Sequence, residues 1–419
     1  MLYLHAALLA LILLTELFFY WLDVVNLKYG EEKVAEEKEW LTEKFSVDST
    51  EKLVAYNRLK MGFARLKAYV SLLFFLFILY SGIFARAVRA VEQIEYSMPV
   101  RGLVFFGAAA VIVTVLKAPF SAFHSFVIEE IFDFNTRGVG LWLKDQVKGL
   151  LVGLVLTALV TGALLWFIDY FARTWWLIGW GFLVAFGLLM QVIYPRVIAP
   201  LFNEFDKVEE GELYEAVQDV FDRAGFECSQ VYTMDASSRS KHSNAYFVGF
   251  GRTKRVVLYD TLVEQMDLDQ LQAVLAHELA HWKKGHIWKG VLRSALKNGV
   301  IFYILFHLLN SDWIFGMFNL PPEAVYAGLV VSFLWISPVF RWLSPLQNYF
   351  SVKNEKEADS FALEVMNSGR PMIGALYRLV GENLSNPFPH PLYAAFNYSH
   401  PPVPERIRRL KGEETPDQQ

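Results

Sequence analysis

The sequence predicts a mainly α-helical, polytopic membrane protein with a metal site in the part outside the membrane. Three observations support this prediction: seven long apolar stretches, an HExxH motif on a predicted helix, and a single cysteine. Apolar residues fill 54% of the chain, and the 26 glycines raise that share to roughly 60%, against about 45–50% in soluble domains on the same count. The net charge of −4 argues against a nucleic-acid partner.

Seven apolar stretches are long enough to cross a membrane as helices, since a bilayer core of about 30 Å needs about 20 mostly apolar residues. They are Leu2–Val24, Ala68–Ala87, Gly102–Phe120, Gly149–Ile168, Trp175–Tyr194, Gly290–Leu309 and Ala324–Leu343. The first has no basic start and no small-residue cleavage site, so we expect it to be a retained span. Arg293 and Lys297 interrupt the sixth, for which a buried helix of a soluble domain is the alternative.

The charges between these stretches predict the orientation in the membrane. Lys and Arg total 8 from Lys28 to Arg65 and 3 in the third loop, whereas the second, fourth and sixth loops hold 2, 1 and 0. Short loops rich in Lys and Arg stay in the cytoplasm. We therefore expect the N-terminus outside and the C-terminus inside. Because no transit peptide or retrieval signal is recognisable, a bacterial inner membrane is expected first and the endoplasmic reticulum membrane second.

The residues outside the spans predict short helices and a hairpin. The predicted elements are an amphipathic helix over Leu213–Ala224, β-prone runs over Ala245–Phe250 and Arg255–Tyr259 joined by a turn at Gly251–Lys254, a helix over Asp267–Lys284, and an amphipathic helix over Glu355–Met366. Asp267 is the expected N-cap of its helix, and Gly285 is the expected stop.

The motif His277-Glu278-Leu279-Ala280-His281 predicts a zinc site. Two histidines four residues apart lie on one face of a helix, so both imidazoles can reach one Zn²⁺. Glu278 is rotated by about 100° from His277, which suits a general base acting on the water that the metal activates. Because Cys228 is the only cysteine, a multi-thiolate site is excluded, and one zinc ion per chain must be held by histidines and carboxylates.

A catalytic zinc site needs a third protein ligand. His286 is the nearest candidate, but it does not fit the metzincin spacing, and a helix-end histidine near the membrane is the simpler interpretation. Glu355 and Asp359 are better candidates because they lie four residues apart on one predicted helical face. One could bind the metal while the other orients a ligand histidine. Taken alone, the pair also fits an ordinary charged helix surface.

The motifs together resemble the type I CAAX prenyl proteases, which are integral-membrane zinc metallopeptidases. The resembling segments are Phe126–Glu130 with Phe134-Asn135, Ser243–Phe247, Arg255–Leu262, His277–Trp282, Glu355–Ala362, Tyr398–Pro402 and Glu405-Arg406. They follow in order through nearly the whole chain. Val352 departs from the family, which often has arginine at this position after the serine.

The resemblance implies a role for each residue of the metal site. It implies a gluzincin-type domain with a small β-sheet, in which His277, His281 and Glu355 bind zinc. Glu278 would be the base, and Asp359 would support a ligand histidine. The seven spans would form a barrel around a large chamber that the zinc site caps at its cytoplasmic end. The reaction would be removal of the three C-terminal residues after a prenylated cysteine.

Three further residues are implied to meet the substrate. Asn244 would contact the peptide backbone from an edge strand, and His400 and Arg406 would line the site, stabilising the oxyanion or holding a peptide carboxylate. The expected partners are therefore a lipidated peptide or protein and membrane lipid, with no nucleic acid.

The domain division follows from these assignments. Residues 1–194 form a membrane region with five spans, 195–289 carry the HExxH helix, 290–345 hold spans six and seven, and 346–419 complete the catalytic domain. Two other functions stay open: membrane-protein quality control by a protease without a prenyl requirement, and a non-enzymatic chamber that binds a lipid-like molecule. Glu16, an ionisable residue inside the first span, either faces a wet cavity or bonds to another helix.

Overall fold

The computed structural model describes residues 1–45, 50–226, 230–248 and 255–412. Within these residues, seven helices are long and apolar enough to span a membrane, which confirms the predicted number. They are α1 (Leu2–Glu36), α3 (Thr50–Tyr80), α5 (Met98–Phe123), α7 (Val139–Tyr170), α8 (Trp175–Ile193), α12 (His286–Leu309) and α14 (Val325–Trp342). Cys228 and the predicted turn Gly251–Lys254 lie outside the described residues.

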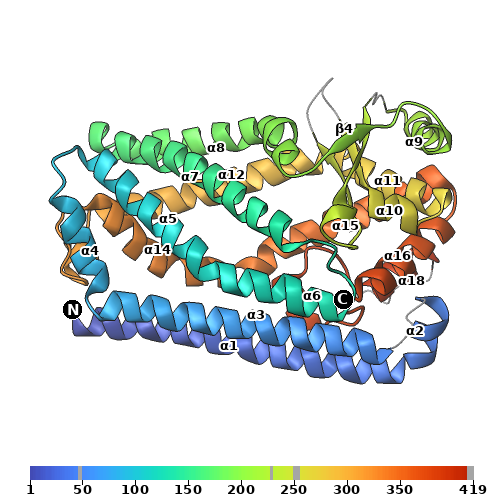
Figure 1. The fold of residues 1–419 in the computed structure, drawn as a ribbon, viewed down its shortest axis with the longest axis horizontal. Helices are drawn as coiled ribbons and strands as arrows, with labels where there is room; N and C mark the ends of the chain where they lie inside the picture. Colours follow the sequence, from blue (N-terminus) through green and yellow to red (C-terminus); the bar gives the residue numbers. More distant parts are fainter. Residues whose placement is uncertain (46–49, 227–229, 249–254, 413–419) are drawn as a thin grey trace.

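The remaining described helices are short or lie outside the spans. They are α2 (Lys38–Lys44), α4 (Ile83–Glu92), η1 (His124–Ile128), α6 (Glu129–Ile131), η2 (Tyr194–Ile198), η3 (Ala199–Leu201), α9 (Glu212–Arg223), η4 (Ala236–Ser238), α10 (Asp260–Gln265), α11 (Leu268–Lys283), α13 (Asp312–Gly316), α15 (Ser344–Met366), α16 (Arg370–Asn383), α17 (Pro391–Asn397) and α18 (Val403–Leu410). α9, α11, α15, α16 and α18 gather at one end of the molecule, beside the strands (Figure 1).

The spanning helices contact one another in a closed ring. α1 meets α3, α3 meets η1 at the end of α5, and α5, α7, α8, α12 and α14 follow in order until α14 returns to α1. In the most apolar 18-residue window of each span, at most 33% of the residues are buried. This closed order of contacts is the expected barrel arrangement of the seven spans (Figure 1).

The barrel narrows at the end away from the strands, where α5 also contacts α14. Gly102 of α5 makes this approach possible, because Leu165 and Tyr326 occupy the space that a Cβ atom would need. The sixth span, α12, exposes large apolar side chains such as Leu292 and Leu296. It therefore fits a span better than the buried soluble helix that was the alternative.

The predicted end of the second span at Ala87 is wrong. α3 ends at Tyr80, and α4 starts after Gly82, whose φ of 77° is left-handed. Only glycine takes this conformation without steric cost, so the chain turns there although its hydrophobicity continues. At its other end, α3 begins at Thr50 and not at the predicted Ala68, because the helix continues through the more polar sequence between them.

The helices around the HExxH motif follow the prediction closely. Asp267 caps α11 by accepting a hydrogen bond from the Gln270 backbone N–H at 2.8 Å, and Gly285 ends this region with a φ of 68°.

The predicted start of the last helix at Glu355 is wrong, because α15 begins at Ser344, directly after α14. Pro345 in its first turn is compatible with a helix start, since the proline lacks only an N–H that would be unpaired there.

The described strands form a four-stranded sheet in the order β1-β2-β4-β3. Their bounds are β1 (Phe205–Lys207), β2 (Val231–Met234), β3 (Ala245–Val248) and β4 (Arg255–Tyr259). β3 and β4 pair antiparallel, as the hairpin pattern predicted, whereas β2 pairs parallel with β4. In the described sheet β3 has a neighbour on one side only, so its other edge is free.

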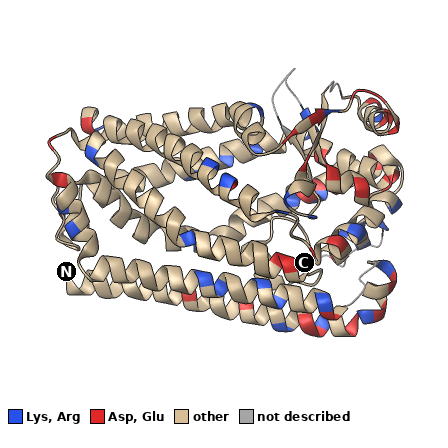
Figure 2. Cartoon of the chain, viewed as in Figure 1, with Lys and Arg blue, Asp and Glu red and all other residues tan. Residues whose placement is uncertain are grey.

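One apolar core holds the sheet against the helices that carry the motif. Its buried members include Val217 of α9, Val256 and Leu258 of β4, Leu275 of α11 and Phe361 of α15. The segments 195–289 and 346–412 therefore share a core although two spans separate them in sequence. Charged residues are also frequent at this end of the molecule, whereas most of the spanning helices carry few (Figure 2).

Two ion pairs join the first span to its neighbours. Glu16 pairs with Arg341 of α14 at 2.5 Å, and Asp23 pairs with Arg65 of α3 at 3.3 Å. All four residues line a cavity of about 430 Å³. Glu16 thus has both of the surroundings that the sequence left open, a polar cavity and a bond to another helix.

Candidate metal centre

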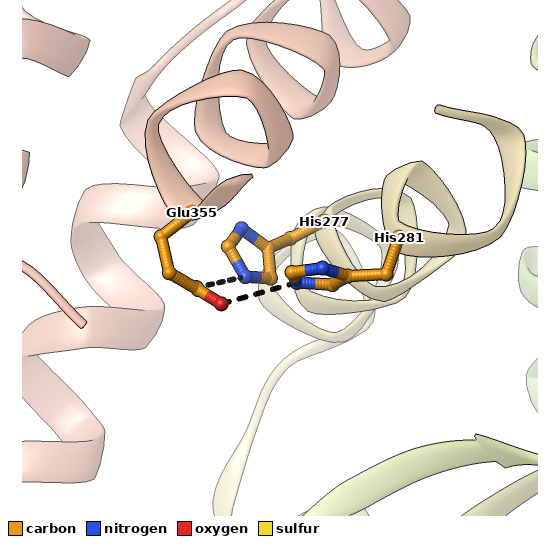
Figure 3. Close-up of side chains that lie close together, drawn as sticks. All are labelled: His277, His281 and Glu355. Carbon is orange, nitrogen blue, oxygen red and sulfur yellow. Dashed lines mark hydrogen bonds and ion pairs between the residues drawn. The ribbon is translucent and has the colours of Figure 1, made fainter. Parts of the chain in front are cut away.

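The three expected zinc ligands come together where α11 packs against α15. His277 and His281 lie one turn apart on α11, and Glu355 reaches them from α15 (Figure 3). One ligand atom of each residue lies within 4.8 Å of the other two. The Glu355 carboxylate oxygens are 3.1 Å from His277 Nε2 and 3.4 Å from His281 Nε2.

These distances test whether a zinc ion would fit. Two ligand atoms that are each about 2.1 Å from a tetrahedral ion lie about 3.4 Å apart. The measured separations match this value, and two imidazoles with one carboxylate form a standard ligand set for catalytic zinc. Within the described residues, this is the only group of three or more His, Cys, Asp or Glu side chains with such spacing.

Asp359 orients the His277 ring by bonding to Nδ1, the ring nitrogen that does not face Glu355. Its Oδ1 lies 2.9 Å from His277 Nδ1, so Nδ1–H donates to the carboxylate and Nε2 is left for a metal. Arg406 in turn donates to both Asp359 oxygens, at 2.9 and 2.6 Å. Burial alone would raise the pKa of Asp359, but the hydrogen bonds from His277 and Arg406 hold it well below its usual value. The carboxylate therefore stays charged.

The two histidines that could bind the metal have opposite pKa shifts. Burial lowers the pKa of His281 to about 4, which keeps its ring neutral and able to bind a metal. Burial also acts on His277, but hydrogen bonds to Asp359 and Glu355 outweigh it and raise the pKa of His277 to about 9. A metal that binds His277 at neutral pH must therefore displace a proton.

His286 is a part of the site that sequence reasoning missed. It starts α12, at the helix end where the sequence placed it, but its ring is only 4% exposed and its Nδ1 lies 3.0 Å from His281 Nδ1. Its Nε2 bonds to Glu357 at 3.0 Å. The left-handed turn at Gly285 brings this ring back onto α11. That glycine, together with the position of Glu357 two residues after Glu355, was the available signal.

We expect His286→Ala to weaken zinc binding by about 10- to 100-fold, the usual cost of removing a group that orients a metal ligand. Zinc affinity would be measured by competition with a chromogenic chelator. Lys289→Ala is the matched control, because Lys289 also pairs with Glu357, at 3.5 Å, and is half-exposed. Equal zinc affinity in the two variants would show that His286 does not support His281.

Glu278 lies next to the ligands without joining them. Burial raises the pKa of its carboxyl above the usual value. Across the described part of the chain, the Glu278 carboxylate takes part in no hydrogen bond or ion pair. A half-buried carboxylate that no other side chain engages is available to take a proton from a water molecule.

The structure separates His400 from Arg406, which the resemblance had grouped together. His400 is 56% exposed, and its Nε2 lies 3.3 Å from Glu355 Oε2, on the open side of the site. Ser399 Oγ lies 2.9 Å from its Nδ1. The guanidinium of Arg406 is instead buried and occupied by Asp359. His400 is thus accessible to a substrate, whereas Arg406 supports the ligands from inside.

Asn244 lies at the free edge of the sheet, directly before β3. Its carbonyl accepts a hydrogen bond from the Tyr259 N–H of β4 at 3.1 Å. Bonded and non-bonded pairs alternate along antiparallel strands, so the N–H of the next residue, Ala245, points away from β4. The Asn244 side chain accepts from this N–H at 2.9 Å and is exposed. An extended peptide would meet the exposed Asn244 side chain there, beside α11, which packs against β3.

Known proteins resemble this chain in both of its parts. Residues 29–204 match the family model "CAAX prenyl protease N-terminal, five membrane helices", and residues 207–414 match "Peptidase family M48". The "CAAX prenyl protease 1 homolog" of Arabidopsis thaliana is 34% identical over 301 residues, covering 72% of this chain and 71% of the relative. "CAAX prenyl protease 1" of Saccharomyces cerevisiae is 31% identical, covering 77% and 76%.

A solved structure agrees with the fold. The crystal structure of S. mikatae Ste24p matches with a TM-score of 0.81 at 26% identity, covering 93% of this chain and 98% of that one. The family match, the seven candidate spans and the grouped His277, His281 and Glu355 agree with one another. The chain therefore belongs to the CAAX prenyl protease 1 family, and it is an integral, multi-pass membrane metallopeptidase of family M48.

Proposed function

We propose that this protein is a zinc endopeptidase that removes the three C-terminal residues after a prenylated cysteine. One observation carries the chemistry: ligand atoms of His277, His281 and Glu355 lie within 4.8 Å of one another, and the Glu355 oxygens lie 3.1 and 3.4 Å from the two Nε2 atoms, close to the separation expected for zinc ligands. The substrate class is supported by the names of the relatives, which are CAAX prenyl proteases. The seven apolar spans would contact membrane lipid and would surround a lipid tail with apolar side chains.

Each residue of the site has a task in this reaction. When bound, zinc would lower the pKa of a water molecule and polarise the scissile carbonyl. Glu278 would take the proton of the attacking water and later give it to the leaving amine. His400 would donate a hydrogen bond to the developing oxyanion, because it is exposed beside Glu355. Asp359 and Arg406 would keep the His277 ring in place.

The peptide backbone would bind to the free edge of β3. Adding a strand to a sheet edge uses main-chain hydrogen bonds and is nearly independent of sequence. The exposed Asn244 side chain would provide the first contact, and the outward-pointing N–H of Ala245 would bind the peptide once Asn244 Oδ1, which now accepts from it, turns away. Specificity must then come from elsewhere, and the lipid tail inside the ring of spans would supply it.

The direct test uses purified protein in detergent and a peptide that ends in a farnesylated CAAX sequence. Mass spectrometry should show release of the intact C-terminal tripeptide. A chelator should abolish release, and added Zn²⁺ should restore it. Cleavage at internal positions, or cleavage that resists the chelator, would contradict the proposal.

We also propose that the metal centre faces the cytoplasm, on the support of the loop charges. The positive-inside rule predicts this orientation in a bacterial inner membrane, which we propose first, and equally in the endoplasmic reticulum membrane. In a Cys228→Ser background expressed in a bacterial inner membrane, Glu210→Cys should resist a membrane-impermeant thiol reagent in intact cells, whereas Glu323→Cys should react. Both positions are exposed. The opposite labelling pattern would reverse the orientation.

A further inference from the structure

A second buried carboxylate, Glu129, lies outside the metal centre and takes no part in the proposed chemistry. It is 8% exposed and belongs to α6, at the C-terminal end of the third candidate span. Tyr56 of α3 donates its hydroxyl to Glu129 Oε1 at 3.0 Å, and His242 Nε2 lies 3.0 Å from Oε2. A buried charge is costly unless it is paired and hydrogen-bonded, and Glu129 satisfies both conditions.

Four of the described residues hold His242 in place. Its Nδ1 lies 2.7 Å from Asn383 Oδ1 of α16, and Phe134 stacks on its ring with centroids 4.3 Å apart. Its backbone carbonyl accepts a hydrogen bond from Thr261 Oγ1 at 3.0 Å. Glu129, on the remaining side, is the only charged group among these four partners.

His242 lies close to Asn244 in the chain, so the Glu129–His242 pair can affect the position of Asn244. His242 precedes Asn244 by two residues, a distance of at most about 7 Å along an extended chain. The segment that leads into His242 is also bound to the residues that follow α6. The Lys241 N–H donates a hydrogen bond to the Phe134 carbonyl at 3.1 Å, and Ser240 forms a β-bridge with Asn135. A shift of His242 would therefore be passed on to Asn244 and the start of β3.

We propose that Glu129 and His242 form a positioning pair that sets Asn244 and the free edge of β3 for peptide binding. Within the described structure, neither residue forms a hydrogen bond or ion pair with His277, His281 or Glu355. The pair acts through the strand, so it should control the affinity for peptide and leave the metal in place. This inference rests on the proposed function, in which the peptide binds along β3.

The test measures peptide binding in a Glu278→Gln background, where cleavage does not interfere. Glu129→Gln removes the charge but keeps the size of the side chain. We expect the Kd for a fluorescent farnesylated CAAX peptide to rise about tenfold, the effect of one or two lost hydrogen bonds. Zinc content should not change. The matched control is Glu130→Gln, since Glu130 is exposed and bonds only to Asn135 among the described residues.

A second comparison distinguishes positioning from a general loss of structure. In the presence of Asn244→Ala, Glu129→Gln should add less than a twofold change, because the pair acts through Asn244. Independent, multiplying losses would overturn the inference, and so would an equal Kd for the Glu129 and Glu130 variants.

His242→Gln provides a second route to the same result if Glu129→Gln does not fold. It should raise Kd by a similar factor, and an unchanged Kd would overturn the inference. The proposed function fails in a different way: the wild type would bind peptide without releasing a tripeptide, while the effect of Glu129→Gln on binding would persist.

Discussion

The Glu278→Gln variant should bind one zinc ion per chain and lose peptidase activity, with kcat falling about 10²- to 10⁴-fold, the range for loss of general acid–base catalysis. Glutamine has nearly the size of glutamate but cannot take a proton from water. Zinc should remain, because Glu278 lies outside the group formed by His277, His281 and Glu355. Metal analysis by mass spectrometry and the peptide-release assay would measure the two quantities on one preparation.

Glu355→Gln is the matched control, with the same chemical change on the neighbouring helix. This variant should lose zinc as well as activity, because a carboxylate that lies 3.1 and 3.4 Å from the two ligand histidines is replaced by an amide. If Glu278→Gln lost its zinc while remaining folded, the roles of the two glutamates would have to be exchanged. Near-normal activity in Glu278→Gln would remove Glu278 as the base.

Helix geometry alone predicted the part of the metal site that lies on one helix, α11. His277 and His281 lie on one face because they are four residues apart, and Asp267 and Gly285 mark the bounds of their helix. The spacing of Glu355 and Asp359 showed that they share a face, but it did not assign their roles. The resemblance supplied that assignment, because the contact between α11 and α15 joins residues 78 positions apart.

The features of the site that the sequence did not predict depend on contacts between residues far apart in the chain. Arg406 bonds to Asp359 across 47 positions, and His242 meets Glu129 across 113. No periodicity within one helix reports such pairs. His286 was also interpreted without its contact to His281, because that contact depends on the left-handed turn at Gly285. The end of the second span was placed too late for a related reason: hydrophobicity continues past Gly82, while the backbone turns there.

The largest effect of the substrate should come from its lipid tail. Main-chain pairing along β3 cannot distinguish one peptide from another. Each buried CH₂ group contributes about 0.8 kcal/mol, so a fifteen-carbon farnesyl chain contributes several kcal/mol even after a large discount for its lost freedom. The spans offer uncovered apolar surface for this burial, because at most 33% of the most apolar window of each span is buried within the protein.

We therefore expect farnesylated CAAX peptides to be cleaved with a kcat/KM at least about 100-fold higher than the same peptides with a free cysteine, a difference of about 2.7 kcal/mol. Peptides whose cysteine carries five-, ten- or fifteen-carbon prenyl chains form a matched series, along which kcat/KM should rise with length. Asn244→Ala should lower kcat/KM for all members by a similar factor, because it acts on the peptide and not on the tail. Equal kcat/KM for farnesylated and bare peptides would contradict tail burial and favour a quality-control protease, while leaving the roles of His277, His281, Glu355 and Glu278 unchanged.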